Sequence, residues 1–267
     1  MQTITATGAD PVGETMQEID QRLRNTFAVL EKVANGIVKG NIRAAIVSGA
    51  AGCGKTYTLE RCLARGESSG LITLNTVRGS MSAIGLYKQL YECSNERGVL
   101  MLDDCDSIFG DLDALNLLKA SLDTGKSRRV HWNKESRVLD EEGVPRSFEF
   151  NGAMVFITNI DFTAEIEAEK KMTPHYKALM SRTMYVDLGI HSKREILVRI
   201  GQVVFSSTFL KDNDLKKEQA QEMMTWLTQN LTRVRTLSIR TILQLTSLVK
   251  TDPDWRSMAQ AIMLKTR

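Results

Sequence analysis

The chain has few cysteines, little net charge and no long apolar run. Only four of its 267 residues are cysteine and none forms a C-x-x-C pair, so we expect free thiols rather than disulfides or a zinc site. The formal net charge of +3 is too small to indicate nucleic acid or membrane binding by itself, so any basic surface must be local. No apolar run approaches the length of about 18 residues that spans a membrane, and the first 20 residues are too polar for a secretory signal. These absences predict a cytoplasmic protein without a membrane contact.

What remains is an ordinary globular composition, with 42% hydrophobic and 25% charged residues. A chain of this length can bury a sizeable core as one large domain, alone or with a small appendage.

Residues 49–56 read Gly-Ala-Ala-Gly-Cys-Gly-Lys-Thr, the G-x-x-x-x-G-K-[ST] pattern of a phosphate-binding loop. The pattern follows an apolar run at 44–47 and precedes a helix-like stretch at 55–64, a context that argues against a chance match in a glycine-bearing turn. Backbone N–H groups and the start of the helix would surround a phosphate, Lys55 would reach the β- and γ-phosphates, and the Thr56 hydroxyl would hold Mg²⁺. We therefore predict ATP binding by Gly49, Ala50, Ala51, Gly52, Cys53, Gly54, Lys55, Thr56 and Tyr57.

Short apolar segments alternate with helical ones up to about residue 190. Strands are predicted at 44–48, 71–75, 99–102, 153–158 and 184–188, with helices between them at 83–93 and 112–122 among others. Right-handed crossovers then predict a three-layer α/β fold with a parallel sheet. Four further helices, at 196–205, 219–231, 239–249 and 255–264, predict a small all-α lid. The expected domains are a nucleotide-binding core over 1–190, with a loose arm at 1–13, and a lid over 191–267.

Polar residues follow two of the predicted strands. Asp103 and Asp104 come directly after Val99–Leu102, where Asp103 would hold Mg²⁺ and Asp104 would orient or deprotonate the attacking water. Asn159 ends the 153–158 strand, from which it would reach the γ-phosphate or that water. The simpler alternatives are solvated acids at a strand end and an asparagine that forms a turn.

Five features together resemble the AAA+ family of ring-forming ATPases. They are the phosphate loop, the apolar strand followed by two acids, the strand-ending Thr158-Asn159 pair, an arginine before the last strand, and a helical lid. The resemblance covers about residues 20–265. It implies that Asn159 is the first sensor, that Arg182 is an arginine finger for the neighbouring subunit, and that Arg240 is the second sensor. It also implies a homo-oligomeric, hexamer-like ring. Arg182 could instead cap a helix or pair with an acid, and Arg233 and Arg235 compete with Arg240.

The chain departs from the family pattern at two places. Family members usually carry Glu where this chain has Asp104, and the shorter side chain predicts slow hydrolysis; Asp106 is either a substitute or a helix cap. The segment 76–87 occupies the place of the family's pore loop, but its Ile84-Gly85 pair lacks the preceding aromatic residue of protein-threading members. That difference argues mildly against protein unfolding.

Residues 125–150 form an insertion that we predict to be a hairpin with acids at its turn. Its first arm places basic residues around Trp132, a combination that suits phosphate neutralisation with base stacking. A solvated hairpin or a subunit contact is an equally ordinary interpretation. The candidate DNA contacts are Arg78, Arg128, Arg129 and Lys134.

The compact core-plus-lid design resembles helicase loaders and AAA+ proteins of phages and mobile elements. The leading hypothesis is therefore a Mg²⁺-dependent ATPase that loads, positions or remodels a complex in DNA replication or related DNA metabolism. Two alternatives stay open: a remodeller of a partner protein, and a slow ATP-gated assembly switch.

Overall fold

The computed structural model describes residues 13–206 and 208–266, so the predicted loose arm falls almost wholly outside the described residues. The chain divides into two compact units. Among the described residues, the α/β unit comprises 27–49 and 55–188, and the helical unit comprises 13–26, 50–54, 189–206 and 208–266. The division after Leu188 lies close to the predicted boundary. The grouping of residues up to 26 and of 50–54 with the helical unit differs from the predicted partition.

A five-stranded parallel sheet forms the centre of the α/β unit, in the order β2-β3-β6-β1-β7. Its strands are β1 (Ala44–Ser48), β2 (Thr73–Arg78), β3 (Gly98–Asp103), β6 (Ala153–Thr158) and β7 (Met184–Asp187). The three inner strands, β3, β6 and β1, are buried along their whole length. Because all strands are parallel, their carboxyl ends meet at one edge, and the segments that follow β1, β3 and β6 are brought together there.

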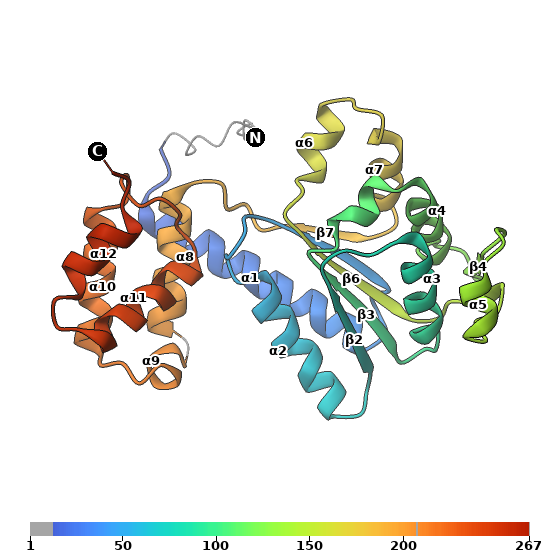
Figure 1. Ribbon diagram of the computed structural model, residues 1–267, viewed down its shortest axis with the longest axis horizontal. Helices are drawn as coiled ribbons and strands as arrows, with labels where there is room; N and C mark the ends of the chain where they lie inside the picture. Colours follow the sequence, from blue (N-terminus) through green and yellow to red (C-terminus); the bar gives the residue numbers. More distant parts are fainter. Residues whose placement is uncertain (1–12, 207, 267) are drawn as a thin grey trace. The chain divides into compact units, whose positions relative to one another are not determined.

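Helices cover both faces of this sheet (Figure 1). One face carries α2 (Lys55–Ser68), and the other carries α3 (Ala83–Glu92) and α4 (Leu112–Ser121). A further helix, α1 (Met16–Val38), contributes residues 27–38 to this unit, and its last residue lies against Gly66 of α2. Polar caps set two helix starts: Ser82 Oγ accepts from Gly85 N, and Asp111 accepts from the first turn of α4. The predicted three-layer α/β class is confirmed.

Shorter elements complete the α/β unit. The 3₁₀ helix η1 (Asp106–Gly110) follows β3, and α6 (Phe162–Glu167) and α7 (Thr173–Met180) connect β6 to β7. Their aromatic residues pack edge to face, as in the Phe109–Phe162 and Phe162–Tyr176 pairs with ring centroids 5.1 and 5.0 Å apart. These contacts fix the segment that ends at Arg182.

The insertion contains two antiparallel strands, β4 (Arg129–His131) and β5 (Ser147–Glu149), as the hairpin prediction requires. Its connection is longer than a turn, because a short helix, α5 (Arg137–Glu141), lies between the strands and carries the acids predicted for the turn. Val130 and Phe148 are buried opposite each other, and Phe148 packs on Tyr87 of α3 with ring centroids 5.1 Å apart. The insertion is therefore part of the core rather than a projecting arm.

The helical unit contains α8 (Lys193–Ser206), α9 (Phe209–Asp212), α10 (Lys217–Gln229), α11 (Ile239–Thr251) and α12 (Trp255–Met263). Met223 and Trp226 lie in its apolar core, where Trp226 meets Trp255 edge to face. A buried carboxylate, Glu195, fixes the start of α8: it accepts from the backbone N–H groups of His191 and Ser192, and Arg22 donates to it at 2.5 Å. Burial raises the pKa of Glu195, but these hydrogen bonds outweigh it and the net pKa is lowered.

Candidate nucleotide site

Lys55 lies at the start of α2, at the carboxyl edge of the sheet, and is buried. Its Nζ donates to Gly49 O at 2.7 Å and to Asn159 Oδ1 at 2.8 Å. The phosphate-loop lysine and the asparagine predicted after β6 are therefore in direct contact. The hydrogen bonds hold the ammonium group beside the loop, where it can meet an anionic ligand.

Thr56 and Asp103 form the second contact at this edge. Thr56 Oγ1 donates to Asp103 Oδ1 at 3.0 Å, and Asp103 is buried at the end of β3. A hydroxyl and a carboxylate oxygen this close are the hard oxygen ligands that suit Mg²⁺. Among residues 13–206 and 208–266, no group of three His, Cys, Asp or Glu side chains is placed to hold a metal ion, so the remaining ligands would have to be nucleotide oxygens and water.

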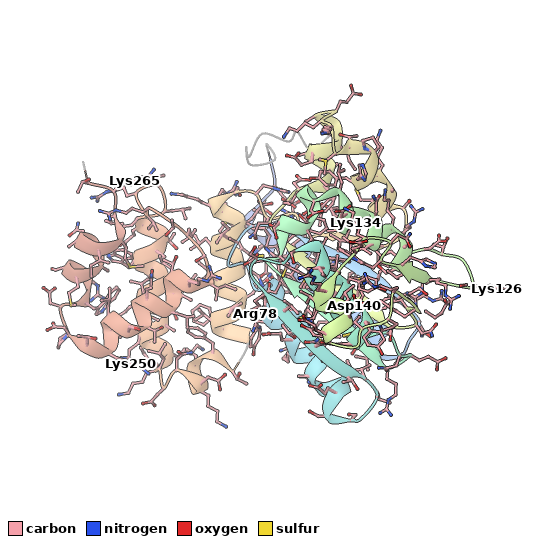
Figure 2. The ribbon with its side chains drawn as sticks, turned by 45° about the vertical axis from the view of Figure 1, so that its right-hand side comes forward. Arg78, Lys126, Lys134, Asp140, Lys250 and Lys265 are labelled. Carbon is pink, nitrogen blue, oxygen red and sulfur yellow. The ribbon has the colours of Figure 1, made fainter. Side chains whose placement is uncertain are left out.

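Arg78 occupies the other oxygen of the same carboxylate. Its Nε donates to Asp103 Oδ2 at 3.2 Å, and its guanidinium also pairs with Glu60 of α2. The predicted placement of Arg78 in a loop is wrong, because it is the last residue of β2 (Figure 2) and is in register with Asp103; its role as a DNA contact stays a prediction. It joins the predicted magnesium ligand to the helix that follows the phosphate loop.

Asp104 has an unusual backbone conformation for a residue with a side chain, with φ at 54°. Its backbone N–H donates to Ile157 O at 3.0 Å, and its exposed carboxylate accepts from Asn159 Nδ2 at 3.0 Å. Asn159 thus lies between Lys55 and Asp104 and uses both ends of its amide. Asp106 is turned away, because Thr158 Oγ1 donates to it at 2.6 Å. Of the two candidate acids for activating water, Asp104 is the one that contacts Asn159, which in turn contacts Lys55.

The middle of the phosphate loop, residues 50–54, belongs to the helical unit. Gly52 O accepts from Ile239 N at 2.8 Å, and Cys53 O accepts from Arg199 Nε at 3.3 Å. Gly52 has φ at 69°, and a Cβ there would lie 2.7 Å from Ser238 Cβ, so the start of α11 requires glycine. Arg199 was not among the predicted site residues, because it lies in the middle of an amphipathic helix, α8, with no motif around it.

Arg240 is exposed in the first turn of α11, next to Ile239, whose backbone N–H donates to Gly52 O. Its competitor Arg235 donates instead to Leu264 O at 2.9 Å. Tyr57, on α2, is 58% exposed, with the Arg61 guanidinium 5.8 Å from its ring centroid.

Arg182 lies at the opposite edge of the sheet, between α7 and the amino end of β7. Its Nη1 donates to Ala178 O at 2.8 Å. The five residues of β1 separate the two edges by roughly 15 Å at about 3.3 Å per residue. That is farther than an arginine side chain extends, so Arg182 does not join Lys55 and Asp103 of the same chain.

Two of the predicted DNA-contact features are wrong. Arg128 is only 5% exposed: its guanidinium donates to Ser121 O and Gly152 O at 3.3 and 3.0 Å. Trp132 packs against Tyr87, with ring centroids 5.6 Å apart, rather than standing free for base stacking. Alternation along the strand places residues 128, 130 and 132 on the inward face.

The exposed basic residues of the insertion are largely paired. Arg129 lies 3.8 Å from Glu149, and Lys134 pairs with Asp113. Lys126 and Lys134 lie apart from each other in Figure 2, so the basic side chains do not form one cluster.

All four cysteines are buried, and each remains a thiol. Burial raises the pKa of Cys93 to about 11 and raises the pKa values of Cys62 and Cys105 as well. These thiols are therefore poor nucleophiles at neutral pH.

No helix in the described part of the chain is long and apolar enough to cross a membrane.

No protein-family model matches the chain. A curated relative is the uncharacterized 36.7 kDa protein of the nrdC–mobD intergenic region of Enterobacteria phage T4, 41% identical over 251 residues that cover 94% of this chain and 77% of the relative.

Among solved structures, a similar chain is a DNA replication initiation factor, with a TM-score of 0.42 and 13% identity over 86% of this chain and 61% of the other. Rhizobiales Trip13 has a TM-score of 0.42 and 13% identity, covering 93% of this chain and 92% of the other. PCH-2 of C. elegans has a TM-score of 0.36 and 14% identity, covering 90% of this chain and 63% of the other. The chain thus spans less than two thirds of the first and the third.

Proposed function

The chain belongs to the same family as the phage T4 protein, and from its site we propose that it binds ATP and hydrolyses it slowly with Mg²⁺ in a homo-oligomeric assembly. One observation carries this proposal: Lys55, Thr56 and Asp103 meet at the carboxyl edge of a parallel sheet, on the loop and strand that the AAA+ resemblance predicts. The loop sequence and this geometry come from independent parts of the chain, because Asp103 lies 47 residues after Thr56.

The contacts suggest how each residue would act. Lys55 would exchange its bonds to Gly49 O and Asn159 for phosphate oxygens and neutralise their charge. Thr56 and Asp103 would hold Mg²⁺, which when bound offsets the negative charge of the triphosphate. Asn159, released by Lys55, would orient a water molecule toward the phosphorus, and Asp104 would accept its proton.

Arg182 would complete the site of a second copy. It lies at the edge away from its own Lys55, so it can approach a triphosphate only when another chain presents one. Arg240, in the first turn of α11, would serve as the second sensor. An oligomer in which every site uses two chains follows from this arrangement.

For the biological role we propose DNA metabolism in a phage or mobile element, in a cytoplasmic setting. The phage relative and the core-plus-lid resemblance support this role. Because Arg128 is buried, the DNA contacts proposed now are Lys126, Arg129 and Lys134. An ATP-gated assembly switch is the second candidate, and the Asp104–Asn159 hydrogen bond favours it, since that bond occupies one oxygen of the acid that would accept the proton from water.

The test measures steady-state ATPase rates alone and with single-stranded DNA, duplex DNA or an unfolded protein. Lys55→Ala should abolish nucleotide binding, and retained tight binding would contradict the loop assignment. Stimulation by DNA that disappears in the Lys126/Arg129/Lys134 triple-alanine variant supports the DNA role. Stimulation by protein alone supports a remodeller, and a slow rate indifferent to all additions supports the switch.

A mixing experiment tests the shared site. Arg182→Ala should bind ATP but not hydrolyse it, and so should Asp104→Asn. Mixing the two variants should restore activity, because some interfaces then combine an intact Arg182 with an intact Asp104. The absence of any recovery would contradict a site built from two chains.

A further inference from the structure

A second concave site lies at the amino edge of the sheet, away from the phosphate loop. It is a cavity of about 350 Å³ within the α/β unit, beside the residues that lead into β1 and β7. Its lining includes three arginines from separate parts of the chain: Arg43 before β1, Arg128 at the start of the insertion, and Arg182 before β7. Asp123 is the one acidic residue in the lining. The cavity therefore carries a positive charge.

Arg128 is the most informative of the three. It is buried, and its guanidinium meets two backbone carbonyls and the face of Phe150, 5.1 Å from the ring centroid. Burial and the neighbouring Arg43 lower the pKa of Arg128 to about 10. Glu149 opposes this lowering, but in the described part of the chain it forms its ion pair with Arg129, and no carboxylate pairs directly with any of the three arginines. A buried cation that no carboxylate pairs with directly is costly, and an anion placed beside it would reduce that cost.

Arg182 adds a donor that has no partner in this unit. Its Nε is buried and has no hydrogen-bond partner among the described residues, whereas its Nη1 donates to Ala178 O. Guanidinium groups bind tetrahedral oxyanions through paired N–H donors, and several around one cavity suit phosphate better than a single carboxylate.

We propose that this cavity is an oxyanion site that takes a phosphate group between Arg43, Arg128 and Arg182. The insertion thereby supplies its buried arginine, Arg128, to a ligand site. The phosphate has two possible sources: a free phosphate compound, or the terminal phosphate of ATP held by a second copy. The second source rests on the proposed function, whereas the first does not.

The first experiment separates this site from the phosphate loop by using Lys55→Ala as the background. Thermal melting of that variant is followed in inorganic phosphate and in pyrophosphate. If free phosphate occupies the cavity, the added Arg43→Ala or Arg182→Ala change weakens the apparent affinity at least tenfold. Arg129→Ala is the matched control, since it removes an adjacent exposed arginine that does not line the cavity.

The second experiment uses the chain with Lys55 intact and a non-hydrolysable ATP analogue. If the phosphate comes from a second copy, the analogue drives association of the wild type. Arg43→Ala and Arg128→Met then weaken association at least tenfold while each isolated chain binds the analogue with unchanged affinity. Arg43 is exposed, so its variant tests the site even if Arg128→Met fails to fold.

A higher melting temperature in phosphate in the first experiment supports the site and identifies a free phosphate compound as its ligand. Association that the arginine variants weaken in the second experiment supports the site and identifies the ATP of a second copy as the source. If phosphate and pyrophosphate leave Lys55→Ala unchanged and the arginine variants associate like the wild type, the proposal is overturned. Failure of the wild type to bind ATP would contradict the proposed function alone, because the first experiment does not depend on it.

Discussion

Arg78 should compete with the magnesium ion for Asp103. Its guanidinium already donates to Asp103 Oδ2 at 3.2 Å, while the other carboxylate oxygen accepts from Thr56. A divalent ion bound by Thr56 and Asp103 would lie about 5–6 Å from this cation. Removing the positive charge should therefore tighten Mg²⁺ binding.

The size of the effect follows from Coulomb's law. A single and a double charge at about 5.5 Å repel by roughly 1.5 kcal/mol at the dielectric constant of water, and by about four times as much at a constant near 20. The Arg78 side chain is 57% exposed, so the aqueous limit applies and salt reduces it further. About 1 kcal/mol remains, which corresponds to a roughly fivefold change in affinity.

The assay is a Mg²⁺ titration of fluorescent-nucleotide binding by the wild type and by Arg78→Gln. The variant should reach half-saturation at three- to tenfold lower Mg²⁺. Arg97→Gln is the matched control: it removes an arginine at the amino end of β3, about 20 Å along the strand from Asp103. An unchanged or higher Mg²⁺ requirement in Arg78→Gln would refute the competition.

Three further predictions concern the acid, the loop and the helical unit. Asp104→Glu should raise ATP turnover at least about tenfold in steady-state assays if the short side chain limits the rate, and lost turnover would contradict this reasoning. Gly52→Ala should lower the melting temperature and nucleotide affinity more than Gly40→Ala, which has a similar φ of 73° but no atom within 4 Å; equal effects would exclude the contact with Ser238. Because the folded pKa of Glu195 is lowered from 4.5, its stabilisation is complete above that value and is lost as the pH falls through the lower one. Glu195→Gln should therefore lower the free energy of unfolding by roughly 3 kcal/mol at pH 7. The variant should also lose less stability than the wild type between pH 7 and acid, as measured by chemical denaturation at neutral and at acidic pH.

The features that the sequence predicted well are those fixed by neighbours in the chain. The phosphate loop, the acids after β3 and the asparagine after β6 each depend on a strand that is buried along its whole length, so hydrophobicity located them. The shared carboxyl edge then followed from a parallel sheet.

The placement of β2 was wrong by two or three residues, and Arg78 was misplaced with it. This strand lies at the edge of the sheet, it is polar, and most of its residues are only half-buried, so its hydrophobic pattern is weak. Leu71, which the pattern selected as the first strand residue, is 56% exposed.

Arg128 was misread for a different reason. Strand β4 has only three residues, too few for alternation to indicate which face is inward, and a basic run ordinarily lies in solvent. Arg199 carried no local signal at all, since its contact with Cys53 depends on how distant parts of the helical unit pack.

The left-handed conformation of Asp104 links the chemistry of the site to the stability of the fold. A residue with a side chain is less stable at φ 54° than glycine, by about 1 kcal/mol in typical cases. Asp104→Asn keeps the shape and loses the carboxylate, so it should melt at least as high as the wild type while turning over no ATP. Because this acid lowers the stability of its own fold, substitutions at position 104 would raise stability at the cost of activity. Relatives with Asn or Gly at this position would be expected to bind nucleotide without hydrolysing it.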